Sequence, residues 1–491
     1  MKASEELHQL IHSMNMSEKR YFKIHSSLHT IGKTNNYIRL FDFIESQEKY
    51  DEQEVKQKFK GETFIRHLPS EKHYLYQQIL DALNAYNQEK TFLSRYANTL
   101  VSIEILYNKG LYKHCHKLIL KSKAEAYSLE KFAILQLLIH WETILFIRDE
   151  DEKNLSKSLQ EEGRLLEAMQ IQAVLMEYAF QIQIQIDKGN IPSDFADVWE
   201  KKLRARFPPR KEVNSFWATY YYYSGIGLLS SLKKDLLGRY DCYKQIKKLM
   251  DEAPQFIRDL PAIYHLNNNN LVNAMFYLSK LKEAETLIME QCEMMQSSVS
   301  KNPGLSTRVY LNTCESQLFL FYRTKRYQEG CSLNRRIETE LKKIGTNPGP
   351  IVFDLYFMMG AMELVSGNHK ASTRWLNKIL NSEYQSKVRK ELQINTRLLY
   401  LIILLDENDV LFENRLNTYK KFIAQENGLL LHSKILDVLQ VFGEEGLSAK
   451  NRPLLKKKCA EIRNETEKLN QEAINKQFDF AEWIEEKLRV S

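Results

Sequence analysis

Glycine and proline are scarce in this chain of 491 residues, with 17 and 10 copies respectively. Turns use these two residues more than any others, so their scarcity favours long helices over a sheet protein rich in turns. Hydrophobic residues make up 43% of the sequence and charged residues 27%, which is typical of folded proteins and not of disordered chains. The composition therefore predicts a folded, helix-rich protein.

Long apolar runs are also missing. A membrane-spanning helix needs about 20 consecutive apolar residues, and the longest candidate, residues 398–405, is short and ends at Asp406. A signal peptide would need an apolar run where Glu5 and Glu6 stand. The six cysteines form no C-x-x-C pair and mostly lie in apolar helical patterns, as buried thiols do in a reducing compartment. We therefore expect a cytoplasmic protein without a membrane span.

Motifs that carry known chemistry are absent from the sequence. It contains no G-x-x-x-x-G-K-[ST] phosphate loop, no G-x-G-x-x-G after a strand, no H-E-x-x-H zinc pair and no G-x-S-x-G elbow. His114 and His116 flank Cys115, but residues two apart on a helix point to different faces, whereas a zinc pair needs a spacing of three or four. We predict that the protein is not an enzyme and binds no metal or cofactor.

The sequence does contain apolar residues at three- and four-residue spacing, interrupted by short polar turns. The predicted turns are Lys109-Gly110, Asp149-Glu150, Lys188-Gly189-Asn190, Lys233-Lys234, Ser279-Lys280, Lys325-Arg326, Gly367-Asn368 and Glu407-Asn408. Successive turns lie roughly 39 to 46 residues apart, a period typical of repeat proteins. We expect two helices in each period, because a helix pair buries its apolar faces by stacking on neighbouring pairs.

Residues 356–380 (YFMMGAMELVSGNHKASTRWLNKIL) resemble a tetratricopeptide repeat. Gly360 and Gly367 stand where that motif has its two glycines, and Ser372 stands at its small-residue position, where two helices cross closely. The period here is longer than the family's period of about 34 residues, so the resemblance is to degenerate repeats. It implies an all-α fold, namely a right-handed superhelical solenoid of antiparallel helix pairs. Looser matches surround Lys109-Gly110, Ser279-Lys280 and Lys325-Arg326.

The two ends of the chain differ from the repeats. Residues 1–90 predict short helices near Ser4–Met14, Ser17–Ser26, Asn36–Ser46, Asp51–Phe59 and from Ser70 onward, which we interpret as an N-terminal helical cap. Residues 91–425 would form the repeats. Residues 426–491 would form capping helices, one of them from Phe480 to Leu488 behind the N-cap Asp479. Residues 181–186 (QIQIQI) alternate as a strand does, but their flanks favour a helix.

A binding surface follows from the resemblance, because the first helix of each tetratricopeptide pair lines the concave face. The residues placed there are Asn269, Asn273, Tyr277, Glu315, Phe319, Arg323 and Phe357. The amides of Asn269 and Asn273, four residues apart, can hydrogen-bond a peptide backbone. The run Asn267–Asn270 is equally compatible with a polar loop or a helix start. We expect a scaffold or adaptor that binds a peptide or helix of a partner protein.

An alternative function is a regulatory protein whose N-terminal module contacts nucleic acid and whose repeats sense a ligand. The basic residues Lys19, Arg20, Lys23 and Lys33 interleave with Tyr21 and Phe22, as in a nucleic-acid surface. The net charge of +7 is a weak bias over this length. Two further basic clusters, residues 201–211 and 456–458, are explained by a helix dipole and by a mixed-charge solvated face. The aromatic run 216–223 is either core or a peptide-binding surface.

Overall fold

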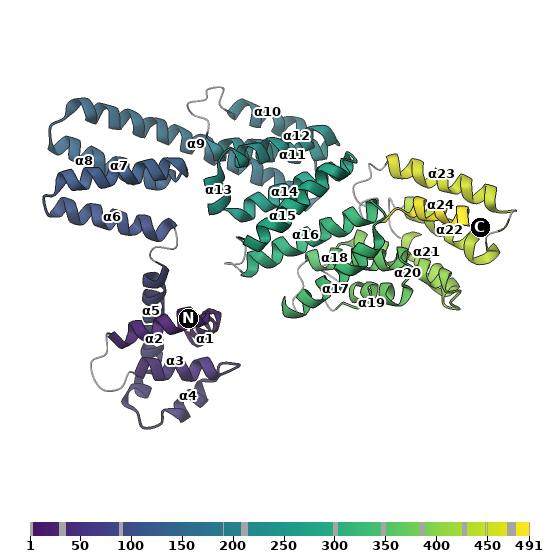
Figure 1. The fold of residues 1–491 in the computed structure, drawn as a ribbon, viewed down its shortest axis with the longest axis horizontal. Helices are drawn as coiled ribbons and strands as arrows, with labels where there is room; N and C mark the ends of the chain where they lie inside the picture. Colours follow the sequence, from purple (N-terminus) through teal and green to yellow (C-terminus); the bar gives the residue numbers. More distant parts are fainter. Residues whose placement is uncertain are drawn as a thin grey trace. The chain divides into compact units, whose positions relative to one another are not determined.

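The computed structural model describes residues 3–28, 36–87, 92–189, 191–207, 215–297, 303–344, 350–382, 388–424, 430–446, 448, 450–468 and 478–490 (Figure 1). These residues form twenty-four α-helices and one short 3-10 helix, with no strand among them, which confirms the all-α prediction. The chain divides into two compact units, Met1–Leu166 and Glu167–Ser491, and each is described by itself. Within the described ranges, no helix is long and apolar enough to cross a membrane.

The first unit begins with six short elements that share a core of their own. They are α1 (Ala3–Ser13), α2 (Met16–Leu28), α3 (Asn36–Ser46), α4 (Glu52–Lys58), η1 (Thr63–His67) and α5 (Leu68–Asn87). Leu7, Phe22 and Phe41 are fully or almost fully buried in this core. The helices predicted for residues 1–90 are therefore present, and the cap predicted at Asp51 accepts backbone N–H bonds from Gln53 and Glu54. The boundaries of the predicted domains at residues 90 and 425 fall outside the described residues.

The start of α2 differs from the prediction by one residue. Asn15 is the N-cap, because its Oδ1 accepts the backbone N–H groups of Ser17 and Glu18 at 2.9 and 3.0 Å. The Asn15 N–H in turn donates to Glu18 Oε2 at 2.9 Å. This reciprocal arrangement is a capping box, so the helix begins at Met16 and not at Ser17.

Three helices of similar length follow, and each packs on the other two. They are α6 (Phe92–Asn108), α7 (Tyr112–Ser128) and α8 (Phe132–Arg148), and after them comes α9 (Glu152–Lys188). The helix predicted for residues 181–186 is confirmed within α9. The expectation of two helices per period is wrong here, since one helix of 37 residues fills the interval. The physical reason is that this interval contains no proline and only Gly163, so nothing in it reverses the chain.

The second unit begins within α9, at Glu167, and its described residues then form fifteen further helices. They are α10 (Phe195–Arg206), α11 (Phe216–Leu232), α12 (Leu236–Asp251), α13 (Pro254–Asp259), α14 (Pro261–Tyr277), α15 (Leu281–Ser297), α16 (Pro303–Arg323), α17 (Tyr327–Ile344), α18 (Pro350–Val365), α19 (His369–Leu380), α20 (Lys390–Asp406), α21 (Phe412–Ala424), α22 (Leu430–Glu445), α23 (Arg452–Lys468) and α24 (Phe480–Val490). From α10 to α23, each helix packs mainly on helices one or two places away in the sequence. One core cluster runs continuously from α11 to α24.

The turns between helices repeat one backbone conformation. Each of the eight predicted turns contains a residue in the left-handed region, with φ between +51° at Asn408 and +78° at Gly367. In the turn after α11, the Asp235 N–H donates to the Ser230 carbonyl at 2.8 Å, five residues back. Such a bond satisfies a carbonyl that the helix end leaves without a partner. The predicted turns are therefore confirmed, and a further one at Glu130 was not anticipated.

The packing of α18 against α19 shows why small residues stand there. A Cβ atom added to Gly360 would lie 2.7 Å from Leu376 Cδ2, so a larger residue here would require the Leu376 side chain to move. The Ser372 hydroxyl donates to the Gly360 carbonyl at 2.7 Å across the same contact. Helices α18 and α19 therefore contact each other closely at Gly360 and Ser372.

Candidate functional site

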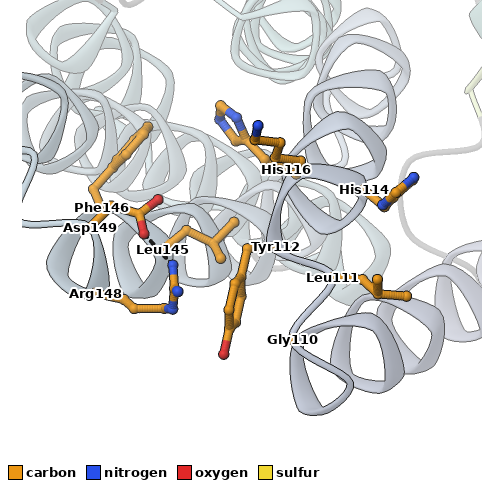
Figure 2. Close-up of a pocket in the computed structure, with 10 residues that line it drawn as sticks. Gly110, Leu111, Tyr112, His114, His116, Leu145, Phe146, Arg148 and Asp149 are labelled. Atoms are coloured by element: carbon orange, nitrogen blue, oxygen red, sulfur yellow. Dashed lines mark hydrogen bonds and ion pairs between the residues drawn. The ribbon is translucent and has the colours of Figure 1, made fainter.

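A pocket of about 500 Å³ lies between the start of α7 and the end of α8 (Figure 2). Its lining comes from the turn before α7, from the first residues of α7 and from the last turn of α8: Gly110, Leu111, Tyr112, Lys113, His114, His116, Leu145, Phe146, Arg148 and Asp149. Apolar side chains therefore face the same space as basic ones. Such a combination suits a ligand with an apolar part and a negative charge.

Arg148 is held in place by two contacts at the pocket. Its guanidinium lies 3.3 Å from the centroid of the Tyr112 ring, and it forms an ion pair with Asp149 (Figure 2). A cation in the last turn of α8 is also favoured by the helix dipole. The Arg148 side chain is 40% exposed, so its charge faces solvent at the edge of the pocket.

A buried charge network lies beside the pocket. Lys123 Nζ contacts Glu142 Oε2 at 2.5 Å and Glu161 Oε2 at 2.9 Å, and the Lys123 and Glu142 side chains are 9% and 6% exposed. His116, which lines the pocket, places Nε2 3.4 Å from Glu142 Oε1. Removing one partner of such a network would leave an uncompensated buried charge. The network therefore fixes α7, α8 and α9 relative to one another.

The exposed face of α7 carries a basic ridge, which we define as Lys113, Lys117 and Lys121. These lysines are four residues apart and exposed, and Leu120 beside them is 50% exposed. Glu125, which also lies on α7, pairs with Arg95 of α6 at 3.1 Å and so does not neutralise the ridge. The four-residue spacing of these lysines is visible in the sequence, whereas no sequence motif marks the pocket.

The predicted partner-contacting residues lie on α14, α16 and α18. Three of them are buried, namely Asn269, Phe319 and Phe357. Asn269 Oδ1 accepts a bond from Gln291 Nε2 at 3.3 Å, and the Phe319 ring packs edge-on against Phe276 with centroids 4.6 Å apart. The asparagine run forms part of α14 and not a loop. These side chains stabilise the helix packing, and a contact with a partner stays a prediction for them.

The other four predicted residues are accessible to differing degrees. Asn273, Tyr277 and Glu315 are half-buried, and Arg323 at the end of α16 is exposed. The Arg239 guanidinium lies 5.5 Å from the centroid of the Tyr277 ring. These four residues remain candidates for a binding surface.

Comparisons with known proteins give the chain no relative. No protein-family model matches the sequence, and neither does any curated protein or solved structure. The resemblance to tetratricopeptide repeats thus rests on the residues alone.

Two of the basic residues of the N-terminal module form ion pairs within the module, whereas Arg20 is exposed. Lys19 pairs with Glu45 at 3.0 Å, and Lys23 pairs with Asp42 at 2.7 Å. These pairs lower the charge available to a nucleic acid, whose binding by this module stays a prediction. Among the basic residues considered above, Lys33, Arg210 and Lys211 lie outside the described residues.

The aromatic run lies on α11 and the cluster of His114, Cys115 and His116 lies on α7, and the most buried members of both pack inside the protein. Tyr222 is buried, whereas Tyr220, Tyr221 and Tyr223 are half-buried and pack against neighbouring rings. Cys115 is fully buried between the exposed His114 and the half-buried His116. In the described part of the chain, no three His, Cys, Asp or Glu side chains are grouped to hold a metal ion.

Helix α24 lies on a surface made by helices far from it in the sequence. The N-cap prediction for Asp479 is confirmed, because its side chain accepts the Glu482 N–H at 2.8 Å. The Asp479 N–H donates to the Tyr322 hydroxyl of α16 at 3.0 Å. On α22, the Phe442 ring packs edge-on against Trp483, with centroids 5.9 Å apart.

Charged side chains flank this apolar contact. Lys325, in the turn after α16, pairs with Glu482 at 2.8 Å and with Glu486 at 3.0 Å. Lys487 pairs with Asp406 of α20 at 2.6 Å. The stacked helices thus hold an amphipathic helix through an apolar centre and a charged rim.

Proposed function

We propose that this chain is a non-enzymatic, cytoplasmic scaffold or adaptor that binds a peptide or a helix of a partner protein. Its helices would form a right-handed superhelical solenoid of antiparallel pairs, similar to tetratricopeptide repeats, behind a helical N-terminal cap. The observation that carries the proposal is the docking of α24. The stacked helices of the second unit already hold one amphipathic helix of the same chain.

The docking of α24 uses the features by which helical grooves recognise helices. Ala481, Ile484 and Leu488 of α24 are buried, and the carboxylates of Glu482 and Glu486 face a lysine. Apolar anchors at spacings of three and four residues with charges at the rim are typical of helix-in-groove binding. A partner helix of similar character would bind a neighbouring accessible face by the same interactions.

The accessible predicted residues supply such a face. Tyr277 at the end of α14 and Arg323 at the end of α16 belong to helices that pack on each other. Tyr and Arg are the residue types that contribute most to protein interfaces, because they offer large contact area and several hydrogen bonds. Phe319 is unsuitable for a test, because it is buried and its replacement would disturb the packing.

The test is affinity capture with the full chain, followed by mass spectrometry. We expect the wild-type chain to retain a specific protein and the variant Tyr277→Ala/Arg323→Ala to retain at least tenfold less of it. The matched control is Tyr74→Ala/Arg415→Ala, which removes an exposed tyrosine and an exposed arginine elsewhere. Circular dichroism confirms that each variant is folded. Capture of no protein, together with tight binding of RNA or DNA, would refute the scaffold and favour the regulatory alternative.

A further inference from the structure

We propose that the pocket between α7 and α8, together with the basic ridge, binds an acidic peptide segment of a partner protein, with one apolar side chain of that segment in the pocket. The inference rests on the proposed function, since it names the chemistry of a partner and the place where it docks. Both features lie in the first unit, on helices that pack directly on each other.

The spacing of the ridge matches an extended peptide. Lysines four residues apart on a helix are separated by about 6 Å along its axis, because the rise is 1.5 Å per residue. In an extended chain, side chains on one face recur every two residues, or about 6.6 Å. Carboxylates at alternate positions of a peptide would therefore meet Lys113, Lys117 and Lys121 in turn.

The charge of the ridge is available to such a partner. Among the described residues, no ion pair joins Lys113, Lys117 or Lys121 to a carboxylate, while Glu125 is already paired with Arg95. Solvated lysines attract an acidic segment and raise its rate of association, and the attraction falls as salt increases. The lysines therefore mainly speed up association, and most of the binding affinity has to come from apolar contact.

The pocket supplies that contact at the first lysine of the ridge. Leu145 is buried and Phe146 half-buried in its lining, and Leu111 at its edge is 43% exposed. A volume of about 500 Å³ lies within the range of about 300–1,000 Å³ that ligand pockets have. Arg148, held over Tyr112 and paired with Asp149, offers guanidinium N–H groups to the backbone carbonyls of the peptide at the edge of the pocket.

The same surroundings favour a peptide over a nucleic acid. One face of the Tyr112 ring is covered by Arg148, so a base cannot stack on that face. Leu120 and Ile147 are 50% and 59% exposed, and these aliphatic groups bind apolar side chains and not phosphates.

The probe is a fluorescein-labelled peptide of alternating Glu and Ala with one central Trp, titrated with the full chain at physiological salt. We expect Lys117→Glu/Lys121→Glu to weaken binding at least tenfold, measured by fluorescence anisotropy. The matched control Lys456→Glu/Lys457→Glu reverses two exposed lysines on α23 and should change binding less than twofold. Replacing the Trp of the peptide by Ala should weaken its binding to the wild-type chain at least fivefold. Melting curves establish that the variants fold.

Three results would overturn the proposal. They are equal loss in the ridge and control variants, no effect of the Trp replacement, and tighter binding of single-stranded RNA of the same length through the same lysines. A different experiment, the affinity capture, decides whether the proposed scaffold function is wrong. If the affinity capture retains a partner equally with wild type and Lys117→Glu/Lys121→Glu, the scaffold stands and this docking site is wrong. If no protein is captured, the scaffold itself fails.

Discussion

Individual buried residues give the protein a measurable pH dependence. His432 of α22 is 3% exposed, and burial lowers the pKa of its imidazole from 6.5 to about 4 because the surroundings disfavour the charged form. Burial also lowers the pKa of His265 on α14. The fold therefore holds both rings in the neutral state, whereas the unfolded chain takes up protons at about pH 6.5.

The sign of the effect follows from these pKa values. Between about pH 6.5 and pH 4 the unfolded state binds more protons, so the free energy of unfolding falls as the pH falls through this window. His432 alone contributes about 3 kcal/mol when the full shift is expressed. We expect His432→Leu to reduce the difference in unfolding free energy between pH 7.5 and pH 4.5 by up to about 3 kcal/mol, measured by urea denaturation. An unaltered pH dependence in the Leu variant would show that His432 titrates normally.

At the level of helices, the effect of a glycine on stability depends on the side chains that lie next to it. A Cβ added to Gly360 would lie 2.7 Å from Leu376 Cδ2 of the next helix, whereas a Cβ on Gly163 of α9 would meet nothing within 4 Å. Neither position has a left-handed backbone, so the comparison isolates packing. The two glycines can therefore be compared directly, because both lie inside helices and they differ in how closely a neighbouring helix packs on them.

We expect opposite effects of alanine at these two sites. Gly360→Ala should lower the free energy of unfolding by about 1–3 kcal/mol, because the added methyl group forces the two helices or Leu376 to move. Gly163→Ala should raise it by about 0.5–1 kcal/mol, because alanine loses less backbone entropy in a helix. Chemical denaturation of both variants measures the difference. Stabilisation by Gly360→Ala would mean that the close crossing of α18 and α19 does not constrain this residue.

The sequence predicted the helix and turn pattern well, and the physical reason is local. Polar residues interrupt the apolar periodicity wherever the chain takes up the left-handed conformation, at Lys234 and Ser279 as clearly as at Gly367. The turn at Glu130 falls in the middle of one period, between the turns at Gly110 and Glu150, where the spacing of the predicted turns does not locate it. The single helix α9 was unexpected because a regular spacing of turns says nothing about how many helices lie between them.

The candidate site was much less predictable. Helices α14, α16 and α18 carry apolar residues on most sides, so the spacing alone does not show which face a neighbour covers. For this reason the spacing placed Asn269 and Phe357 on the binding surface although both are buried, whereas Arg323 is exposed as predicted. The pocket combines one turn with the distant end of another helix, and no motif in the sequence records that juxtaposition.

For the molecule as a whole, α24 controls access to a thiol on α23. The Cys459 Sγ donates to the Ala481 carbonyl of α24 at 3.4 Å, the side chain is 3% exposed, and burial raises the pKa of this thiol to about 11. Thiolates and not thiols react with alkylating reagents, so Cys459 is protected while α24 is docked.

We expect Trp483→Ala to loosen α24, because loss of a buried Trp side chain costs about 3–5 kcal/mol. Labelling with iodoacetamide at pH 8 should then modify Cys459 at least tenfold faster than in the wild type, as mass spectrometry of the peptides shows. Cys314 of α16 is the internal control, since it is buried and its pKa is raised to about 12. Equal acceleration at Cys314 would indicate general unfolding and not release of α24.

The position of α24 along the chain also has a consequence during synthesis. Asp479, which donates to the Tyr322 hydroxyl of α16, follows that tyrosine by 157 residues. At about 5–20 residues per second, a ribosome takes roughly 8 to 30 s to make this interval. During that time α24 does not yet exist, so the surface of α16 that it later covers is open. We expect a chaperone or a partner that recognises amphipathic helices to bind this surface before α24 is made.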